Sequence, residues 1–260
     1  MLRKRLFVLA GLTMLICFVA LPVAHAAIKV GRFAYAVEGG RVAAYTFDPT
    51  TGQLRIIQSV GVSTSDEITS DSVTVHPNNK FLYVPTSSDS IAGFAIGKTG
   101  LLTPLSGSPF TTTYVAGQIY FTPSGKFAFT ENWPNNVEAF SVNTATGALA
   151  SLGTVTLGSE TSDLAIMPKG NFIYAANSGS NTISGFAINP TTGALTAVPG
   201  SPFAAGPSCA TEWIHPSGKF LYAENFNGSI SAYSINQKTG TLTQIAGSRS
   251  PVPPTMAIVI

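Results

Sequence analysis

Two carboxylates carry the clearest chemical signal in the sequence. Glu212 stands four residues before Pro216, in a segment that recurs along the chain, and Asp163 stands one place earlier in the preceding copy. The positions equivalent to Glu212 are aliphatic in the other copies: Val73, Ile119, Leu164 and Met256. A carboxylate among packed aliphatic side chains is costly unless it is paired or its pKa is raised. Glu212 is therefore a candidate site residue, and it and the neighbouring Asp163 are the two candidates for a catalytic residue. Alternatively, the strand begins late in this copy and Glu212 is solvated.

The position that Asp163 occupies is polar in every copy. Its members are Ser72, Gln118, Asp163, Thr211 and Thr255. Because successive side chains of a strand point to opposite faces, this set faces away from the set that contains Glu212. We expect it to line a central channel and to bind a ligand. The alternative is that this polar ring holds structural water.

Further acidic residues are expected at the same end of the molecule. Chain direction places there Asp71, Glu131 and Glu224, which we add to the ligand-binding set with Glu212. The same end also carries Glu38, Asp66, Glu67, Asp89 and Glu160, which are not part of that set. An acidic mouth would attract cations and repel anions. Asp66, Glu67 and Asp71 also have the oxygen ligands of a hard-cation site. We favour a solvated acidic loop over a metal site there and expect no metal.

Signatures of familiar enzymes are missing from the sequence. His76 and His215 occupy the same recurring turn, which predicts a turn role for both and not a metal pair. The nucleophile-elbow, zinc-protease, nucleotide-binding and dinucleotide-binding motifs do not occur. We therefore expect no cofactor.

The elements that must position these residues form an internal repeat. Its copies begin at Phe33, Phe81, Phe127, Phe172 and Phe220, which gives a period of roughly 45 to 48 residues. Each copy holds up to four short apolar runs separated by Gly, Pro and Asn, and a Thr-Gly pair recurs where a tight turn needs positive φ. Four antiparallel strands per repeat are typical of a β-propeller blade.

The fold class predicted is all-β, a β-propeller of five four-stranded blades. The first copy lacks an innermost strand, and Met256–Ile260 provide a spare one at the end of the chain. We expect this C-terminal strand to close the ring, because closure removes exposed strand edges. The alternative is that the chain is a fragment of a longer propeller.

Residues 1–26 have the pattern of a signal peptide. A basic start is followed by the apolar run Leu6–Val23 and by Ala24-His25-Ala26, a small-x-small cleavage site. The alternative is a transmembrane anchor. Cleavage predicts a secreted or periplasmic protein, with residues 27–260 as a single propeller domain and no membrane contact.

Signal cleavage also changes the charge and the cysteine count. Without residues 1–26 the net charge falls from +2 to −1, which gives no indication of nucleic-acid binding. Cys209 is the one cysteine that remains, so no disulfide can form within the chain. We expect a monomer.

Several segments resemble one known family. "PSGKFAFTEN", "NTISGFAINPTTGALTAVPGSPF" and "HPSGKFLYAEN" are similar to the repeats of the lactonase family of β-propellers, which includes 6-phosphogluconolactonases, and to YVTN-repeat propellers. The resemblance covers Phe33 to Ile260 and implies a propeller, typically of seven blades, and lactone opening. The family's Asp-Leu-Gly-type motif is replaced here, for example by Tyr83-Val84-Pro85 and Tyr174-Ala175-Ala176, so no catalytic residue is assigned from the resemblance.

Two classes of function follow. The sequence favours a binding or interaction module whose acidic mouth recognises a small polar ligand or a protein partner. The alternative is a lactonase-like hydrolase that opens a sugar or other lactone, with Asp163 or Glu212 as general base on water.

Overall fold

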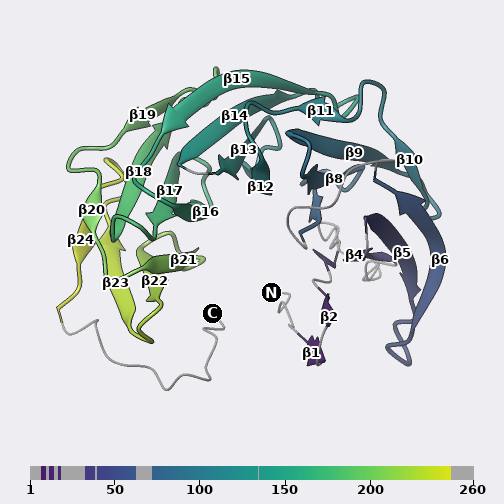
Figure 1. Cartoon of the computed structure of the whole chain (residues 1–260), viewed down its shortest axis with the longest axis horizontal. Coiled ribbons are helices and arrows are strands. Elements are labelled where there is room, and N and C mark those ends of the chain that lie inside the picture. The colour runs from purple at the N-terminus through teal and green to yellow at the C-terminus, as the bar shows by residue number, and fades with distance from the viewer. Residues whose placement is uncertain are drawn as a thin grey trace. The chain divides into compact units, whose positions relative to one another are not determined.

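The computed structural model describes residues 7–9, 12–14, 17–18, 33–38, 40–62, 72–133 and 135–246. Within these residues the regular secondary structure consists of strands, which confirms the all-β prediction (Figure 1). No helix in the described part of the chain has the length and hydrophobicity needed to cross a membrane. The chain divides into two compact units: unit 1 holds residues 1–119 and 142–150, and unit 2 holds residues 120–141 and 151–260.

Unit 1 contains two antiparallel sheets and a short hairpin. The hairpin pairs β1 (Phe7–Leu9) with β2 (Leu12–Met14). The first sheet has the order β3 (Cys17–Phe18), β4 (Phe33–Glu38), β5 (Arg41–Phe47) and β6 (Leu54–Gly61). The second sheet joins β7 (Thr74–Val75), β8 (Phe81–Thr86), β9 (Ser90–Ile96) and β10 (Leu102–Pro104), and β11 (Phe110–Thr111) also pairs with β9.

The predicted closure by the C-terminal strand is wrong. The edge of β4 that was to receive this strand is paired with β3, in the register Cys17 with Tyr35 and Phe18 with Ala34. The strand predicted at Met256–Ile260 lies outside the described residues. Each sheet of the described chain is a separate set of paired strands, and no pairing closes them into a ring.

Unit 2 is built from three consecutive antiparallel sheets. The first is β12 (Ala116–Phe121), β13 (Phe127–Asn132), β14 (Asn136–Val142) and β15 (Leu149–Thr156), whose residues are divided between the two units. The second is β16 (Thr161–Ile166), β17 (Phe172–Asn177), β18 (Thr182–Ile188) and β19 (Leu195–Ala197), with β20 (Phe203–Ala204) on β18. The third is β21 (Cys209–Ile214), β22 (Phe220–Asn225), β23 (Ile230–Ile235) and β24 (Leu242–Gln244).

The recurring Thr-Gly pair makes the turn that the sequence predicts. Gly193 follows β18 with φ of 75° and donates its N–H to the Asn189 carbonyl at 2.9 Å. Its equivalent Gly240 has the same φ and donates to the Asn236 carbonyl at 2.8 Å. A side chain at either position would be strained in this left-handed conformation. The positive-φ prediction is therefore confirmed.

A tyrosine ties three of the described repeats to the glycine turn of the next one. Tyr174 on β17 donates its hydroxyl to the Gly240 carbonyl at 2.7 Å. Within unit 1, Tyr35 and Tyr83 donate in the same way to the carbonyls of Gly100 and Gly147. The repeat that begins at Phe127 has Phe129 in this place, buried and without a hydroxyl. These hydrogen bonds fix how consecutive sheets pack.

Candidate functional site

Asp163 and Glu212 lie on the first strands of neighbouring sheets in unit 2. β16 carries Asp163 and β21 carries Glu212. Both strands are irregular near their starts, with register shifts between Thr161 and Asp163 and between Cys209 and Thr211. Bulges of this kind re-aim side chains and are frequent beside functional sites. Here the Glu212 N–H donates to Oδ2 of Asp163 at 3.1 Å, so the two residues meet directly.

The half-buried carboxylate of Asp163 is held by donors from three strands. The Tyr120 hydroxyl, on β12, donates to Oδ1 at 2.5 Å, and the Leu164 N–H donates to the same oxygen at 2.9 Å. The Glu212 N–H completes the set on Oδ2. An ionised carboxylate only accepts hydrogen bonds, so three donors suit the charged form of Asp163.

Glu212 is buried at a repeat position where the other copies carry an aliphatic side chain. It is 3 % exposed, as Val73 is, and Ile119 and Leu164 are equally buried. Neither of its carboxyl oxygens has a hydrogen-bond partner in the described structure. The alternative of a solvated Glu212 is therefore wrong. A buried carboxyl group without partners favours its neutral, protonated form.

The charges around Glu212 reinforce this preference. Burial is the largest cause that raises the pKa of Glu212 well above its usual value, and the charges of Asp163 and Glu131 act in the same direction. The backbone N–H of Ala165 acts against the shift. Asp163 and Glu212 thus divide into a charged and a protonated member, as paired carboxyl groups in enzymes do.

Tyr120 and Cys209 border the same two carboxyl groups. Burial, followed by the charges of Glu131 and Asp163, raises the pKa of Tyr120 well above its usual value, so the hydroxyl stays a donor. Burial and the charges of Glu212 and Asp163 raise the pKa of the Cys209 thiol to about 12. A thiol with this pKa is not a nucleophile at neutral pH. We call Asp163, Glu212, Glu131 and Tyr120 the acidic cluster.

Glu131 and Glu224 occupy equivalent positions on second strands. Glu131 lies on β13 and Glu224 on β22, both half-buried. Glu224 accepts a hydrogen bond from the Thr211 hydroxyl at 3.4 Å. Of the predicted site residues, the structure therefore brings together Asp163, Glu212 and Glu131, and separately pairs Thr211 with Glu224.

The other predicted site residues are placed elsewhere or are not described. Ser72 is buried and Gln118 half-buried, both in unit 1. Asp71, Thr255 and the acidic loop residues Asp66 and Glu67 lie outside the described residues. In the described ranges, no group of three or more His, Cys, Asp or Glu side chains is arranged to hold a metal ion.

The two histidines are turn residues, as predicted. His76 accepts the N–H of Asn78 on Nδ1 at 3.1 Å, and His215 accepts the N–H of Ser217 on Nδ1 at 3.2 Å. Each ring thereby caps the turn that follows a first strand. These contacts account for both side chains through local structure.

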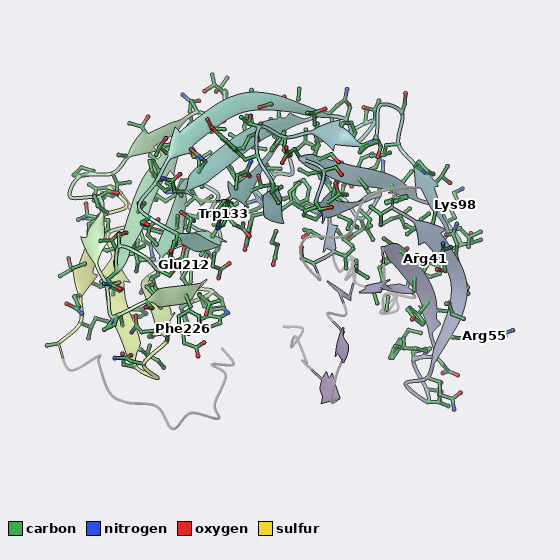
Figure 2. The ribbon with its side chains drawn as sticks, in the orientation of Figure 1. Arg41, Arg55, Lys98, Trp133, Glu212 and Phe226 are labelled. Carbon is green, nitrogen blue, oxygen red and sulfur yellow. The ribbon has the colours of Figure 1, made fainter. Side chains whose placement is uncertain are left out.

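Sequence reasoning missed Tyr120 and two exposed aromatic residues of unit 2. Tyr120 stands two places after Gln118, the repeat equivalent of Asp163, so repeat alignment alone does not pair it with Asp163. Trp133 and Phe226 follow Asn132 and Asn225 directly, where other copies have Ser87 and Ser178. They are 73 % and 78 % exposed. In the view of Figure 2, Glu212 lies between these two aromatic side chains. The sequence did contain an indication of these two residues, because a large aromatic residue replaces serine at the same turn in two of the copies.

Comparison with protein families gives one match over most of the chain. The model described as "Lactonase, 7-bladed beta-propeller" matches residues 24–159 and 102–212. A propeller of this type has seven blades, so the prediction of five closed blades is wrong on this ground too. The expected resemblance to the lactonase family is confirmed.

Individual relatives are similar to the chain in sequence or in fold. A 6-phosphogluconolactonase of Formosa agariphila is 32 % identical over 132 residues, which are 48 % of this chain and 37 % of the relative. The match thus spans little more than a third of that protein. A Lactobacillus plantarum structure has a TM-score of 0.71 at 20 % identity, covering 85 % of this chain and 68 % of the other. The periplasmic gluconolactonase of Pseudomonas aeruginosa has a TM-score of 0.69 at 19 % identity, covering 85 % and 69 %. At these identities the two structures establish similarity of fold.

Proposed function

The chain belongs to the lactonase family of β-propellers, and from this premise we propose that it is a lactone hydrolase in which Asp163 is the general base. Two relatives bear the names of lactone-hydrolysing enzymes. This places the hydrolase ahead of the binding module that the sequence analysis favoured. The observation that carries the proposal is the contact of a hydrogen-bonded Asp163 with a buried Glu212 on adjacent strands.

Asp163 suits the role of base better than Glu212 does. Its half-buried carboxylate is supplied with three donors and can still accept a proton from water. Glu212 has both oxygens buried, and its raised pKa favours the protonated form, which cannot accept a proton. Glu212 contributes through its backbone instead: its N–H orients Asp163, and its neutral side chain adds no second charge.

The reaction needs one carboxylate and one water molecule. Asp163 removes a proton from water as the water oxygen bonds to the lactone carbonyl carbon. The tetrahedral intermediate then collapses, the ring C–O bond breaks, and the proton on Asp163 passes to the departing alkoxide oxygen. The product is the open hydroxy acid, and Asp163 is returned in its ionised form.

Tyr120 orients this base throughout the cycle. Its hydroxyl donates to Asp163 Oδ1, and its raised pKa keeps the proton in place over the working range. The second oxygen is oriented by the Glu212 N–H, which leaves the carboxylate fixed from two sides. Fixed geometry of the reacting groups is a major source of rate acceleration.

The first prediction concerns Asp163 itself. The purified chain should release acid from an uncharged lactone faster than water alone, and Asp163→Asn should lower kcat by about 100-fold or more, because the amide cannot accept the proton. Acid release is measured by pH-stat with the spontaneous rate subtracted. Glu160→Gln, in an exposed turn, removes one negative charge and should retain full activity. A wild-type protein that opens no lactone would instead support a binding module.

A further inference from the structure

Four of the five Thr-Gly turns in the described residues pack on the preceding repeat in the same way. The Phe that opens the preceding repeat lies so close to the turn glycine that an added Cβ would stand no farther than 2.7 Å from the ring. The pairs are Phe33 with Gly100, Phe81 with Gly147, Phe127 with Gly193 and Phe172 with Gly240. In three of the pairs, a tyrosine two places after the Phe also donates its hydroxyl to the glycine carbonyl. This contact between repeats therefore needs a residue without a side chain in the turn.

The fifth turn, at Gly52, has the same conformation but nothing packed on it. Gly52 has φ of 76° and donates its N–H to the Asp48 carbonyl at 2.8 Å, as Gly193 and Gly240 do within their own turns. No described atom lies within 4 Å of a Cβ added at Gly52. Gly52 is also exposed, whereas the glycines of the other four turns are buried. The turn is thus formed in advance of any contact.

The leucine that follows this turn is uncovered as well. Leu54 is 37 % exposed, whereas its equivalents Leu102 and Leu242 are 3 % and 6 % exposed. Leu102 belongs to one hydrophobic cluster with Tyr35, and Leu242 belongs to another with Tyr174. In the packed turns the leucine therefore joins the core of the preceding repeat. We call Thr51, Gly52 and Leu54 the free turn.

The surface that receives such a turn is uncovered in the repeat that begins at Phe220. None of the five turns packs on Phe220, and Tyr222 is half-buried where its equivalents are fully buried. Those equivalents are Tyr35, Tyr83 and Tyr174, each 0 % exposed. The Tyr222 hydroxyl makes no hydrogen bond to any described residue. Ile230 lies on the same face, opposite Glu224, and is half-buried where Ile91 and Ile183 are 0 % exposed. We call Phe220, Tyr222 and Ile230 the free socket.

We propose that the free turn of one molecule docks on the free socket of a second copy of this chain, with Phe220 over Gly52 and the Tyr222 hydroxyl donating to the Gly52 carbonyl. The four packed turns define what the socket accepts: a glycine at positive φ, followed two residues later by leucine. The chain itself carries that partner in uncovered form. Because turn and socket are different surfaces, the contact is heterologous, and each copy binds one neighbour through its turn and another through its socket. The protein thus self-associates head to tail, in place of the monomer expected from the sequence and independently of the proposed hydrolase function.

Variants of the free turn test its part in the association. Sedimentation velocity of the purified chain should show a mass that rises with concentration, and Gly52→Asn should abolish the rise. Asparagine tolerates the left-handed conformation and finds open space in the single chain, but its Cβ would strike Phe220 in the docked state. Gly153→Asn is the matched control, because Gly153 also has positive φ and open space around it. This control should associate as the wild type does. A wild type that stays monomeric, or association that Gly52→Asn leaves intact, overturns the proposal.

Two substitutions of Tyr222 test the socket. Tyr222→Phe removes the hydroxyl and should raise the dissociation constant about 3- to 10-fold, the effect of one hydrogen bond. Tyr222→Lys places a charge where the equivalent tyrosines are fully buried and should abolish association. Circular dichroism establishes that each variant is folded. If Tyr222→Lys does not fold, Tyr222→Phe decides alone, and an unchanged dissociation constant counts against the socket.

Mixing the two blocked variants identifies the occupant of the socket as a second copy. Gly52→Asn keeps an intact socket and Tyr222→Lys keeps an intact turn, so neither variant associates alone. In an equal mixture one turn fits one socket, and the two proteins should form one-to-one pairs without larger species. A mixture that stays monomeric contradicts the proposal. So does a monomeric wild type whose Tm falls in Tyr222→Lys, because the socket would then be filled from within the same molecule.

Discussion

Glu212 and Glu138 are two buried glutamates of unit 2 with opposite surroundings. Glu138 is 1 % exposed and accepts hydrogen bonds from Asn132 at 3.0 Å and from Ser151 at 2.6 Å. Glu212 is 3 % exposed and lacks any partner for its carboxyl oxygens in the described structure. A satisfied buried carboxylate stabilises the fold, whereas an unsatisfied one costs free energy. The difference separates a carboxyl group that stabilises the fold from one that costs stability.

The contrast between the two glutamates predicts opposite effects on stability when each is replaced by leucine. Glu212→Leu restores the aliphatic side chain of the other repeats and should raise the free energy of unfolding by about 1–3 kcal/mol, which corresponds to roughly 2–4 °C in Tm per kcal/mol. Glu138→Leu removes the acceptor of the hydrogen bonds from Asn132 and Ser151 and should lower the free energy of unfolding by a similar amount. Thermal unfolding measures both. Equal destabilisation by the two variants would show that Glu212 has a partner.

The same variant has a characteristic pH dependence. Unfolded Glu212 titrates near 4.5 and folded Glu212 at higher pH, so between these values the folded state binds more protons than the unfolded state. The wild-type free energy of unfolding therefore falls as pH rises from about 4.5 to the folded pKa. Glu212→Leu removes this contribution, and its advantage in Tm should grow with pH across that window. An advantage independent of pH would mean that Glu212 is not buried in its protonated form.

At the scale of the element, consecutive repeats are joined by the tyrosine hydroxyl on the second strand. Tyr174 reaches the Gly240 carbonyl, while its equivalent Phe129 has no hydroxyl to offer Gly193. The surroundings otherwise match: a side chain at Gly193 would meet Phe127 as one at Gly240 would meet Phe172. The repeat that begins at Phe127 thus lacks one hydrogen bond that the neighbouring copies make.

The missing hydrogen bond at Phe129 predicts how two substitutions change the stability of the protein. Phe129→Tyr should place a hydroxyl against the Gly193 carbonyl and raise the free energy of unfolding by about 1 kcal/mol. Tyr174→Phe should lower it by a comparable amount, because the Gly240 carbonyl loses its donor. Chemical denaturation of both variants compares them directly. A destabilised Phe129→Tyr would mean that the packing around Phe129 has no room for the added oxygen.

For the whole molecule, local patterns in the sequence predicted what depends on local structure. Repeat spacing and turn residues predicted the strands and the positive-φ glycines, and the aliphatic position around Glu212 predicted its unusual burial. These local patterns did not predict which strands pair when they are far apart in the sequence. The edge of β4 is paired with β3, whereas the sequence pattern had placed the C-terminal strand there, because different short apolar runs fit that pattern equally well. Tyr120 was missed because it stands two residues after the repeat equivalent of Asp163. Its hydrogen bond to Asp163 depends on how the neighbouring sheets are offset in the folded protein, and the alternation of side chains within one strand does not predict that offset.

The pH profile of kcat/KM on glucono-1,5-lactone shows whether Asp163, oriented by Tyr120, is the base of a lactone hydrolase. For the wild type we expect a rise from acid pH to a plateau, as Asp163 loses its proton. In Tyr120→Phe the rise should move to higher pH, because the carboxylate loses a donor that stabilises its charged form. In Asp163→Asn the rise should vanish together with the activity. A full-rate profile in Asp163→Asn would show that Asp163 is not the base, and a rise that Tyr120→Phe leaves in place would show that Tyr120 does not stabilise its charged form.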